Sequence, residues 1–267
     1  DPSIVPLSFV SERHDRRVHL FASVGSSISP ARNKEKDVNL YLVGCEYAGK
    51  TTLTKKISEW TKETMGEPMN FHDHFTIPTQ EFPPEPAKQY KEAHPQIKEM
   101  LQRFMIEYHS SAAFYDHTHH NVVGCGIEDA VYAPLYYGYG GKNSGSPMRS
   151  PEGQRTTYAR KIEKRMLGLC PNVVLVLMKA SADAIRRRTK ENPTVELGEP
   201  TRGVVKEEDI EFVLNRFEEE FEASTIENKI VLDTTSATED ETLAEFVEKH
   251  EPFMTQGDKE RIRKHQE

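Results

Sequence analysis

The stretch Val38–Thr51, VNLYLVGCEYAGKT, decides the fold class of this chain. Its apolar half predicts a buried strand, and its second half fits the pattern G-x-x-x-x-G-K-[ST] from Gly44 to Thr51. In such a loop, glycines let successive backbone N–H groups curl around an anion at the positive end of the following helix. We expect Lys50 to reach the β- and γ-phosphates of a nucleotide, and the Thr51 hydroxyl to hold Mg²⁺. The predicted nucleotide-binding residues of this loop are Gly44, Tyr47, Ala48, Gly49, Lys50, Thr51 and Thr52.

Short apolar segments alternate with amphipathic helical stretches from residue 38 onward. This alternation predicts an α/β fold of the P-loop NTPase type, a three-layer sandwich whose five-stranded parallel sheet has helices on both faces. The expected strands are Val38–Val43, Met69–Phe75, Asn121–Ile127, Asn172–Met178 and Lys229–Leu232. The expected helices are Lys50–Thr64, Pro95–Tyr115 with one apolar face, 154–168, 182–190, 206–224, and a last one opened by a capping box of Thr238 and Glu241.

Three parts are expected along the chain: an N-terminal extension over 1–37, a P-loop domain over 38–255, and a charged tail over 256–267. The first part is rich in Arg and Ser, as an organelle-targeting segment is, but Glu12, Asp15, Glu35 and Asp37 interrupt it. We interpret it as a partly ordered extension, with targeting as the alternative. The chain starts with Asp1 rather than Met, so we expect the natural start to be missing or removed. The tail is expected to be a solvated helix end or disordered.

The composition limits the class of protein. The 267 residues include 35 basic and 43 acidic ones, which gives a net charge of −8 and a pI near 5.8. An acidic chain argues against a nucleic-acid binder, and no apolar run approaches the roughly 20 residues of a membrane span. The three cysteines, Cys45, Cys125 and Cys170, lie far apart, which excludes a disulfide framework or a zinc–cysteine site. They indicate a reducing compartment, the cytoplasm or an organellar matrix.

A phosphate-binding loop needs an acidic residue near the metal, at the end of a neighbouring strand. Glu128 and Asp129 follow the third expected strand, and Asp233 follows the last one. Ligands of parallel α/β sheets bind beyond the carboxyl ends of the strands, so we favour Glu128 and Asp129, provided that their strand lies beside the first. The same rule places Asp73, near the end of the second strand, on the active edge.

Basic residues follow the fourth expected strand, where Lys179 precedes the run Arg186–Arg188. A basic run on a helix is usually a solvated face. In an acidic protein that must neutralise a triphosphate, three consecutive arginines at this place favour a functional role. The histidines at 72 and 74 and those at 117–120 lack a convergent set of metal ligands, so we expect surface or packing roles for them.

Together these features resemble the P-loop kinases of nucleosides and nucleoside monophosphates, most closely the deoxynucleoside kinase and thymidylate kinase group. The resemblance covers residues 38–250 in the order of elements, and only the phosphate loop matches as a strict motif. It implies that Asp73 acts toward a substrate hydroxyl and that Glu128 is the acid kept after the third strand. It also implies that Arg186 and Arg188 belong to an arginine-bearing lid.

The sequence departs from that group directly after Glu128. The group has an arginine there, which clamps substrate or phosphate, whereas this chain has Asp129. We expect Arg149, Arg155 or Arg160 to substitute for it.

The resemblance also bears on the acceptor. In deoxynucleoside kinases the helix before the third strand carries a glutamine that recognises the base of the substrate. Gln102 lies at a suitable position for this role; the alternative is that it is an exposed helical glutamine. Tyr132, Tyr136 and Tyr137 offer aromatic faces for stacking, with simple packing as the alternative.

The mechanism implied is in-line transfer of the γ-phosphoryl group of ATP, with Mg²⁺, to a small-molecule acceptor that is most simply a nucleoside or a nucleoside monophosphate. The expected catalytic residues are Lys50, Asp73, Glu128 and Arg188. Arg186 is expected to bind the nucleotide, and Thr51 and Glu128 to bind the metal. The residues expected to bind the acceptor are Asp73, Gln102, Asp129, Tyr132 and Arg155. No nucleic-acid partner is expected, and a homodimer or larger assembly is left open.

Three other functions stay open. A regulatory or structural subunit that binds nucleotide without turnover is favoured by the missing arginine after Glu128 and by the N-terminal extension. A kinase of a non-nucleoside metabolite is also compatible with the motifs. A P-loop motor or switch is weakened because the chain has no convincing N-K-x-D motif and no second recognisable domain.

Overall fold

The computed structural model describes residues 40–74, 83–111, 120–141, 154–196, 199–201 and 203–267. All of them belong to one compact unit, and the expected N-terminal extension lies outside the described residues. The strands of the main sheet are β1 (Leu40–Gly44), β2 (Asn70–His74), β3 (His120–Gly124), β4 (Val174–Lys179) and β7 (Lys229–Asp233). The α-helices are α1 (Lys50–Met65), α2 (Pro84–Glu92), α3 (Pro95–His109), α5 (Cys125–Tyr132), α6 (Gln154–Leu169), α7 (Ala182–Glu191), α8 (Ile210–Glu222), α9 (Glu239–His250) and α10 (Gln256–Gln266).

The main sheet is parallel throughout, in the strand order β2-β3-β1-β4-β7. At its centre, Leu42 of β1 lies opposite Val123 of β3 and Val176 of β4. The predicted five-stranded parallel sheet is therefore confirmed. Because β3 and β4 flank β1, the residues that follow these two strands border the phosphate loop.

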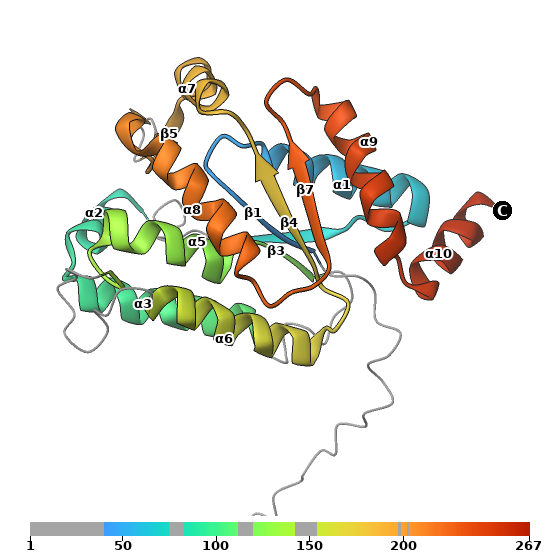
Figure 1. Ribbon diagram of the computed structural model, residues 1–267, viewed down its shortest axis with the longest axis horizontal. Coiled ribbons are helices and arrows are strands. Elements are labelled where there is room, and N and C mark those ends of the chain that lie inside the picture. Colours follow the sequence, from blue (N-terminus) through green and yellow to red (C-terminus); the bar gives the residue numbers. More distant parts are fainter. Residues whose placement is uncertain (1–39, 75–82, 112–119, 142–153, 197–198, 202) are drawn as a thin grey trace, which may run out of the picture. The chain divides into compact units, whose positions relative to one another are not determined.

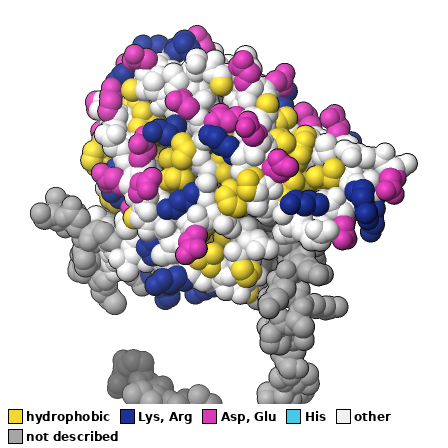
Figure 2. Space-filling view, turned by 45° about the vertical axis from the view of Figure 1, so that its right-hand side comes forward, with side chains coloured by type: hydrophobic (Ala, Val, Ile, Leu, Met, Phe, Trp, Pro, Cys, Tyr) yellow, Lys and Arg dark blue, Asp and Glu magenta, His cyan; other side chains and the backbone are white. Residues whose placement is uncertain are grey.

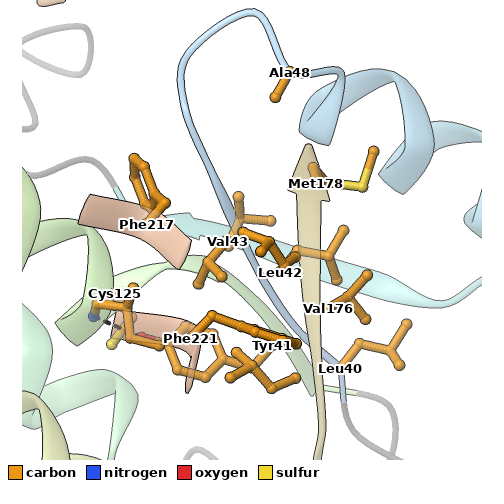
Figure 3. Packing of buried hydrophobic residues seen from close by; sticks show 14 of the residues in the cluster. Leu40, Tyr41, Leu42, Val43, Ala48, Cys125, Val176, Met178, Phe217 and Phe221 are labelled. Carbon is orange, nitrogen blue, oxygen red and sulfur yellow. Dashed lines mark hydrogen bonds between the residues drawn. The ribbon is translucent and has the colours of Figure 1, made fainter. Parts of the chain in front are cut away.

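Helices cover both faces of the sheet, as Figure 1 shows. On one face α5 and α8 pack against β1, and α8 also packs against β4. On the other face α1 packs against β1 and α9 against β7. In Figure 3 the aromatic rings of Phe217 and Phe221 from α8 lie against the buried side chains of β1. Every residue of β1 is buried, which explains why its sequence is an unbroken apolar run.

Two helices form a further layer outside α5, since α6 and α3 both pack against it. The predicted helix at 95–115 is present as α3 up to His109, and residues 112–119 lie outside the described part. The apolar side of α3 faces away from the core, since its large side chains are exposed: Ile97, Met100, Leu101, Phe104 and Tyr108. The helix α2, which starts at Pro84, was not predicted from the sequence. A small antiparallel hairpin of β5 (Thr194–Glu196) and β6 (Glu199–Thr201) follows α7 and was not predicted.

The charged end of the chain is an ordered helix that packs against α1. A capping box of Thr255 and Asp258 opens this helix, α10. Just before it, the buried His250 stacks on Phe246 within α9, with ring centroids 5.0 Å apart. Burial lowers the pKa of His250 to about 4, although the nearby Asp258 carboxylate acts in the opposite direction.

The surface mixes charges of both signs with small hydrophobic areas, as Figure 2 shows for one face. Within the described ranges, no helix combines the length and the apolar character needed to cross a membrane.

Candidate functional site

The loop between β1 and α1 has the geometry that its motif requires. Gly44 and Gly49 have positive φ angles of 150° and 95°, and Tyr47 has a φ of 62°. A Cβ at Gly44 would lie 2.5 Å from the carbonyl oxygen of Met178 in β4, so only glycine fits this position. The loop leads into the N-terminus of α1 at Lys50, where the helix dipole favours an anion. Thr51 lies exposed in the first turn of the same helix.

The Lys50 ammonium group is held at the centre of this site. Its Nζ lies 2.9 Å from Oε1 of Glu128 and donates to the carbonyl oxygens of Gly44, at 2.5 Å, and Cys45, at 3.3 Å. The ion pair with Glu128 raises the pKa of Lys50 against the effect of burial. The structure thus brings together the phosphate-loop lysine and the acid that the sequence favours over Asp233. Asp233 ends β7, which β4 separates from β1.

A sharp turn between β3 and α5 places Glu128. Gly124 and Cys125 have positive φ angles of 81° and 45°, which let the helix start directly after the strand. The Tyr41 hydroxyl, reaching across from β1, donates to the carbonyl of Gly124 at 2.9 Å and accepts from the amide of Ile127 at 2.8 Å. Tyr41 thereby fixes both sides of the turn that presents Glu128.

The site holds more negative than positive charge. Burial raises the pKa of Glu128 to about 7, although the Lys50 ammonium group opposes this shift. Asp73 and Glu46 are near enough to Glu128 to raise its pKa further. Loss of solvation also raises the pKa of Asp73, and Lys50 again opposes the shift. Two of these carboxyl groups, those of Glu128 and Asp73, therefore interact with the one ammonium group of Lys50.

Glu46, inside the phosphate loop, connects this loop to the segment after the β5–β6 hairpin. Its Oε2 accepts from the consecutive amides of Val204 and Val205, at 2.8 and 3.0 Å. Gly203 has a φ of +80°, and a Cβ there would lie 2.5 Å from the same oxygen. The Glu46 amide donates to the hydroxyl of Tyr132 at 3.1 Å. The phosphate loop is thus held from both sides through one residue.

The side chain of Arg188 supports the phosphate loop by hydrogen bonds to backbone carbonyl groups. Its Nη1 donates to the carbonyl of Tyr47 at 3.0 Å and to Oγ1 of Thr234 at 3.1 Å, and its Nη2 donates to the Thr234 carbonyl. The Thr234 hydroxyl also donates to the carbonyl of Ala48 at 3.0 Å. Arg188, which was predicted to be a catalytic lid residue, therefore lies beside the loop and contacts carbonyl oxygens there.

The other two arginines of the run have carboxylate partners. Arg186 pairs with Asp183 at 3.0 Å and with Glu211 of α8. Arg187 is the most exposed of the three and lies 4.0 Å from Glu191.

A small pocket, partly open to solvent, lies between α7, α8 and the phosphate loop. Ile185, Val205 and Ile210 form its apolar lining, with Tyr47 and Arg186 among its other lining residues.

Asp129 and Arg155, both predicted to contact the acceptor, bind each other in the interior. Arg155 donates from Nε at 2.6 Å, and also from Nη2, to Oδ2 of Asp129, while the hydroxyl of Tyr139 donates to Oδ1 at 2.9 Å. The Arg155 guanidinium also lies 3.5 Å from Glu99 of α3 and 4.5 Å from the ring centre of Tyr158. The side chains of Asp129 and Arg155 are 0% and 4% exposed, so the two opposite charges are paired away from solvent.

The remaining acceptor candidates lie around the same helices. Gln102 is fully buried on the inner side of α3, which excludes the alternative of an exposed helical glutamine. Tyr132 is buried with its ring edge-on to Phe217, and Tyr136 donates to Asp209 at 3.0 Å. Arg160 pairs with Glu163 and Glu220, and Arg149 lies outside the described residues.

Sequence reasoning missed Glu46, Tyr41, Tyr139 and Thr234. Glu46 occupies a variable position of the motif, where the pattern itself carries no information. The other three act through contacts that only the folded chain creates, so no local sequence signal marks them.

No protein-family model and no curated protein sequence matches this chain. Among solved structures it is similar to the thymidylate kinase from Candida albicans, with a TM-score of 0.52 and 14% identity over 85% of this chain and 94% of that one. It is also similar to the deoxyadenosine kinase from M. mycoides with bound dATP, with a TM-score of 0.50 and 16% identity over 80% of this chain and 100% of that one. The fold is that of the P-loop nucleoside and nucleotide kinases. At these identities the likeness shows the fold alone, and it agrees with the resemblance stated from the motifs.

Proposed function

We propose that this protein transfers the γ-phosphoryl group of ATP to a nucleoside or nucleoside monophosphate. The observation that carries the proposal is the meeting of Lys50 and Glu128, 2.9 Å apart, at the carboxyl edge of the sheet with Asp73 close by. The two solved structures described above, a thymidylate kinase and a deoxyadenosine kinase with dATP, support both the nucleotide and the class of acceptor.

The residues of the phosphate loop would bind and orient the nucleotide. The amides at the N-terminus of α1 would face the phosphates, and Lys50 would balance the charge of the transferred group. Arg188 holds the carbonyl side of the loop, and we assign it the role of keeping the loop in this conformation. Arg186 would contact the nucleotide from the lid only after exchanging its carboxylate partners.

The donor set around the loop fits a magnesium ion. The exposed Thr51 hydroxyl and the Glu128 carboxylate would supply oxygen ligands of the kind that this ion prefers. When bound, the ion would neutralise charge on the phosphates.

The acceptor would lie between β2, α3 and α5. Asp73 offers a carboxylate that can orient or deprotonate a hydroxyl, and its raised pKa makes it a better base than an ordinary aspartate. Gln102 offers an amide on the inner side of α3. Arg155, one of the expected substitutes for the missing arginine, is bound to Asp129, which favours a hydroxyl over a phosphate acceptor.

A nucleotide-binding subunit without turnover is the second candidate. It is favoured by the same Asp129–Arg155 pair. Asp129 stands where the related kinases have the clamping arginine, and Arg155, an expected substitute, is bound to Asp129.

One set of measurements tests the proposal and separates it from the second candidate. Phosphoryl transfer from labelled ATP is measured with each common nucleoside, deoxynucleoside and monophosphate, and ATP binding is measured by calorimetry. We expect transfer by the wild type and a loss of about 100- to 1,000-fold in Lys50→Ala, because the charge on the transferred group is no longer balanced.

Lys55→Ala, an exposed position in the same helix, is the matched control and should keep full activity. ATP binding by the wild type without transfer to any acceptor would favour the non-catalytic subunit. Equal transfer by Lys50→Ala and the wild type would refute the assignment of the loop.

A further inference from the structure

The carboxylate of Glu46 fills an anion-binding site made of backbone amides. Its Oε2 accepts hydrogen bonds from two consecutive amides, those of Val204 at 2.8 Å and Val205 at 3.0 Å. Gly203, directly before them, has a φ of +80°, and a Cβ at this position would lie 2.5 Å from the same oxygen. Successive N–H groups that converge on one oxygen beside a left-handed residue form the kind of concavity that binds phosphate. The phosphate loop therefore places a carboxylate of its own in a site suited to a phosphoryl group.

Contacts other than those of Glu46 also hold these amides in place. The side chain of Val205 is buried and lines the small pocket between α7, α8 and the phosphate loop. The next amide, that of Lys206, donates to the hydroxyl of Tyr136 at 3.4 Å. The same hydroxyl donates to the Asp209 carboxylate at 3.0 Å. The two amides would thus keep their position if the Glu46 side chain turned away from them.

The charge of Glu46 is the same in sign as that of a nucleotide. Glu46 lies two residues after Gly44 inside the phosphate-loop motif, and its carboxylate is near enough to Glu128 to raise the pKa of that group. A polyphosphate in this loop would therefore be repelled by Glu46, whereas the adjacent amides attract any anion. Glu46 is half-buried and Val204 beside it is exposed, so the carboxylate has a path to solvent. An exchange of anions at the amides would relieve the repulsion.

We propose that the amides of Val204 and Val205 are a phosphoryl-binding site, which Glu46 occupies as an internal substitute until a ligand binds. This proposal rests on the proposed function, because it requires a nucleotide beside the phosphate loop. The exchange breaks no covalent bond: the carboxylate gives up two hydrogen bonds and a phosphoryl oxygen accepts them. The γ-phosphoryl group of ATP and the phosphate of a nucleoside monophosphate share this chemistry. In either case Glu46 competes with the ligand and lowers its apparent affinity.

Amide hydrogen exchange at Val204 and Val205 in the full chain tests which group occupies the site. Without ligand, exchange should be about tenfold faster in Glu46→Ala than in the wild type, because the acceptor is gone. Saturating ATP with Mg²⁺ or thymidine monophosphate should restore the slow exchange in Glu46→Ala. Restoration by ATP and not by ADP would identify the γ-phosphoryl group as the occupant, and restoration by the monophosphate alone would identify the acceptor phosphate. Exchange that stays fast with every one of these ligands would overturn the proposal.

The binding affinity tests the competition. Whichever of ATP and thymidine monophosphate restores the slow exchange should bind Glu46→Ala about tenfold more tightly than the wild type in calorimetry. Glu208→Ala is the matched control, because it removes an exposed acidic residue of the same segment, and it should leave this affinity unchanged. Unchanged or weaker binding of that ligand by Glu46→Ala would contradict the proposed competition.

Failure of this proposal can be distinguished from failure of the proposed function. A wild type that binds ATP and transfers its phosphoryl group, combined with fast exchange in Glu46→Ala at saturating ligand, overturns only the exchange of anions at the amides. A wild type that binds no ATP overturns both proposals, since no nucleotide then competes with Glu46.

Discussion

Replacing Arg155 by methionine tests the buried pair that takes the place of the missing arginine. The Asp129 side chain is 0% exposed, and it accepts hydrogen bonds from Nε and Nη2 of Arg155. Methionine keeps most of the packing of the arginine stem against Tyr158 but leaves the Asp129 carboxylate without its cation. Removal of one partner of a buried pair costs about 3–5 kcal/mol, so the free energy of unfolding should fall by that amount. For a domain of this size the melting temperature should fall by roughly 6–20 °C.

Urea unfolding followed through the single tryptophan, Trp60, measures the change. Arg165→Met is the matched control, because Arg165 lies on the same helix and pairs with Glu107 at the surface, with side chains 37% and 36% exposed. The control should cost no more than about 1 kcal/mol. Asp129→Asn combined with Arg155→Met should be less destabilising than Arg155→Met alone, because no charge is then left unpaired. If Arg155→Met costs no more than the control, the pair does not stabilise the fold and the argument fails.

Two further predictions concern the C-terminal helices and the segment after the β5–β6 hairpin. The pKa of His250 is about 4 in the folded chain and near 6.5 when unfolded, so the wild type should lose up to about 3 kcal/mol of stability as the pH falls from 6.5 to 4. In unfolding titrations against pH, His250→Phe should lack this loss and the exposed His265→Phe should keep it; identical profiles would contradict the assignment. Glu46→Ala should speed amide hydrogen exchange at Val204 and Val205 about tenfold, while Glu46→Gln, which keeps an acceptor oxygen, should change it less; unchanged exchange in Glu46→Ala would mean that Glu46 does not hold this segment.

The parts of the fold that depend on local sequence could be predicted from it. The phosphate loop is a local structure whose glycines, lysine and flanking strand and helix are adjacent in the chain, so its motif predicts it directly. The five strands of the parallel sheet lie within three residues of their predicted ends. Buried central strands such as β1 and β4 are short apolar runs, which the sequence pattern detects.

Features that depend on contacts between elements distant in the sequence could be predicted only on the condition that certain strands are neighbours, or not at all. The choice of Glu128 over Asp233 required the third strand to lie beside the first, and the sheet order meets that condition. The burial of Asp129 against Arg155 was not predicted, because the two residues are 26 positions apart and either could have faced a ligand. The helical tail packed on α1 was missed for a similar reason, since its sequence is charged and its docking depends on α1.

Helix α3 shows a further limit of periodicity. The pattern correctly predicts a helix with one apolar face, but it does not specify which way that face points. The inner side of α3 must border the proposed acceptor site and the buried Asp129–Arg155 pair, so Glu99 and Gln102 occupy it and the apolar residues are left outside.

This division makes the role of the inner side testable on a single helix. Gln102→Ala, on the inner side, should chiefly raise the KM for the acceptor, because Gln102 borders the proposed acceptor site. Phe104→Ala, at an exposed position on the outer side, is the matched control and should leave both kcat and KM unchanged. An equal rise of the KM in both variants would mean that α3 affects the acceptor only through its packing against α5.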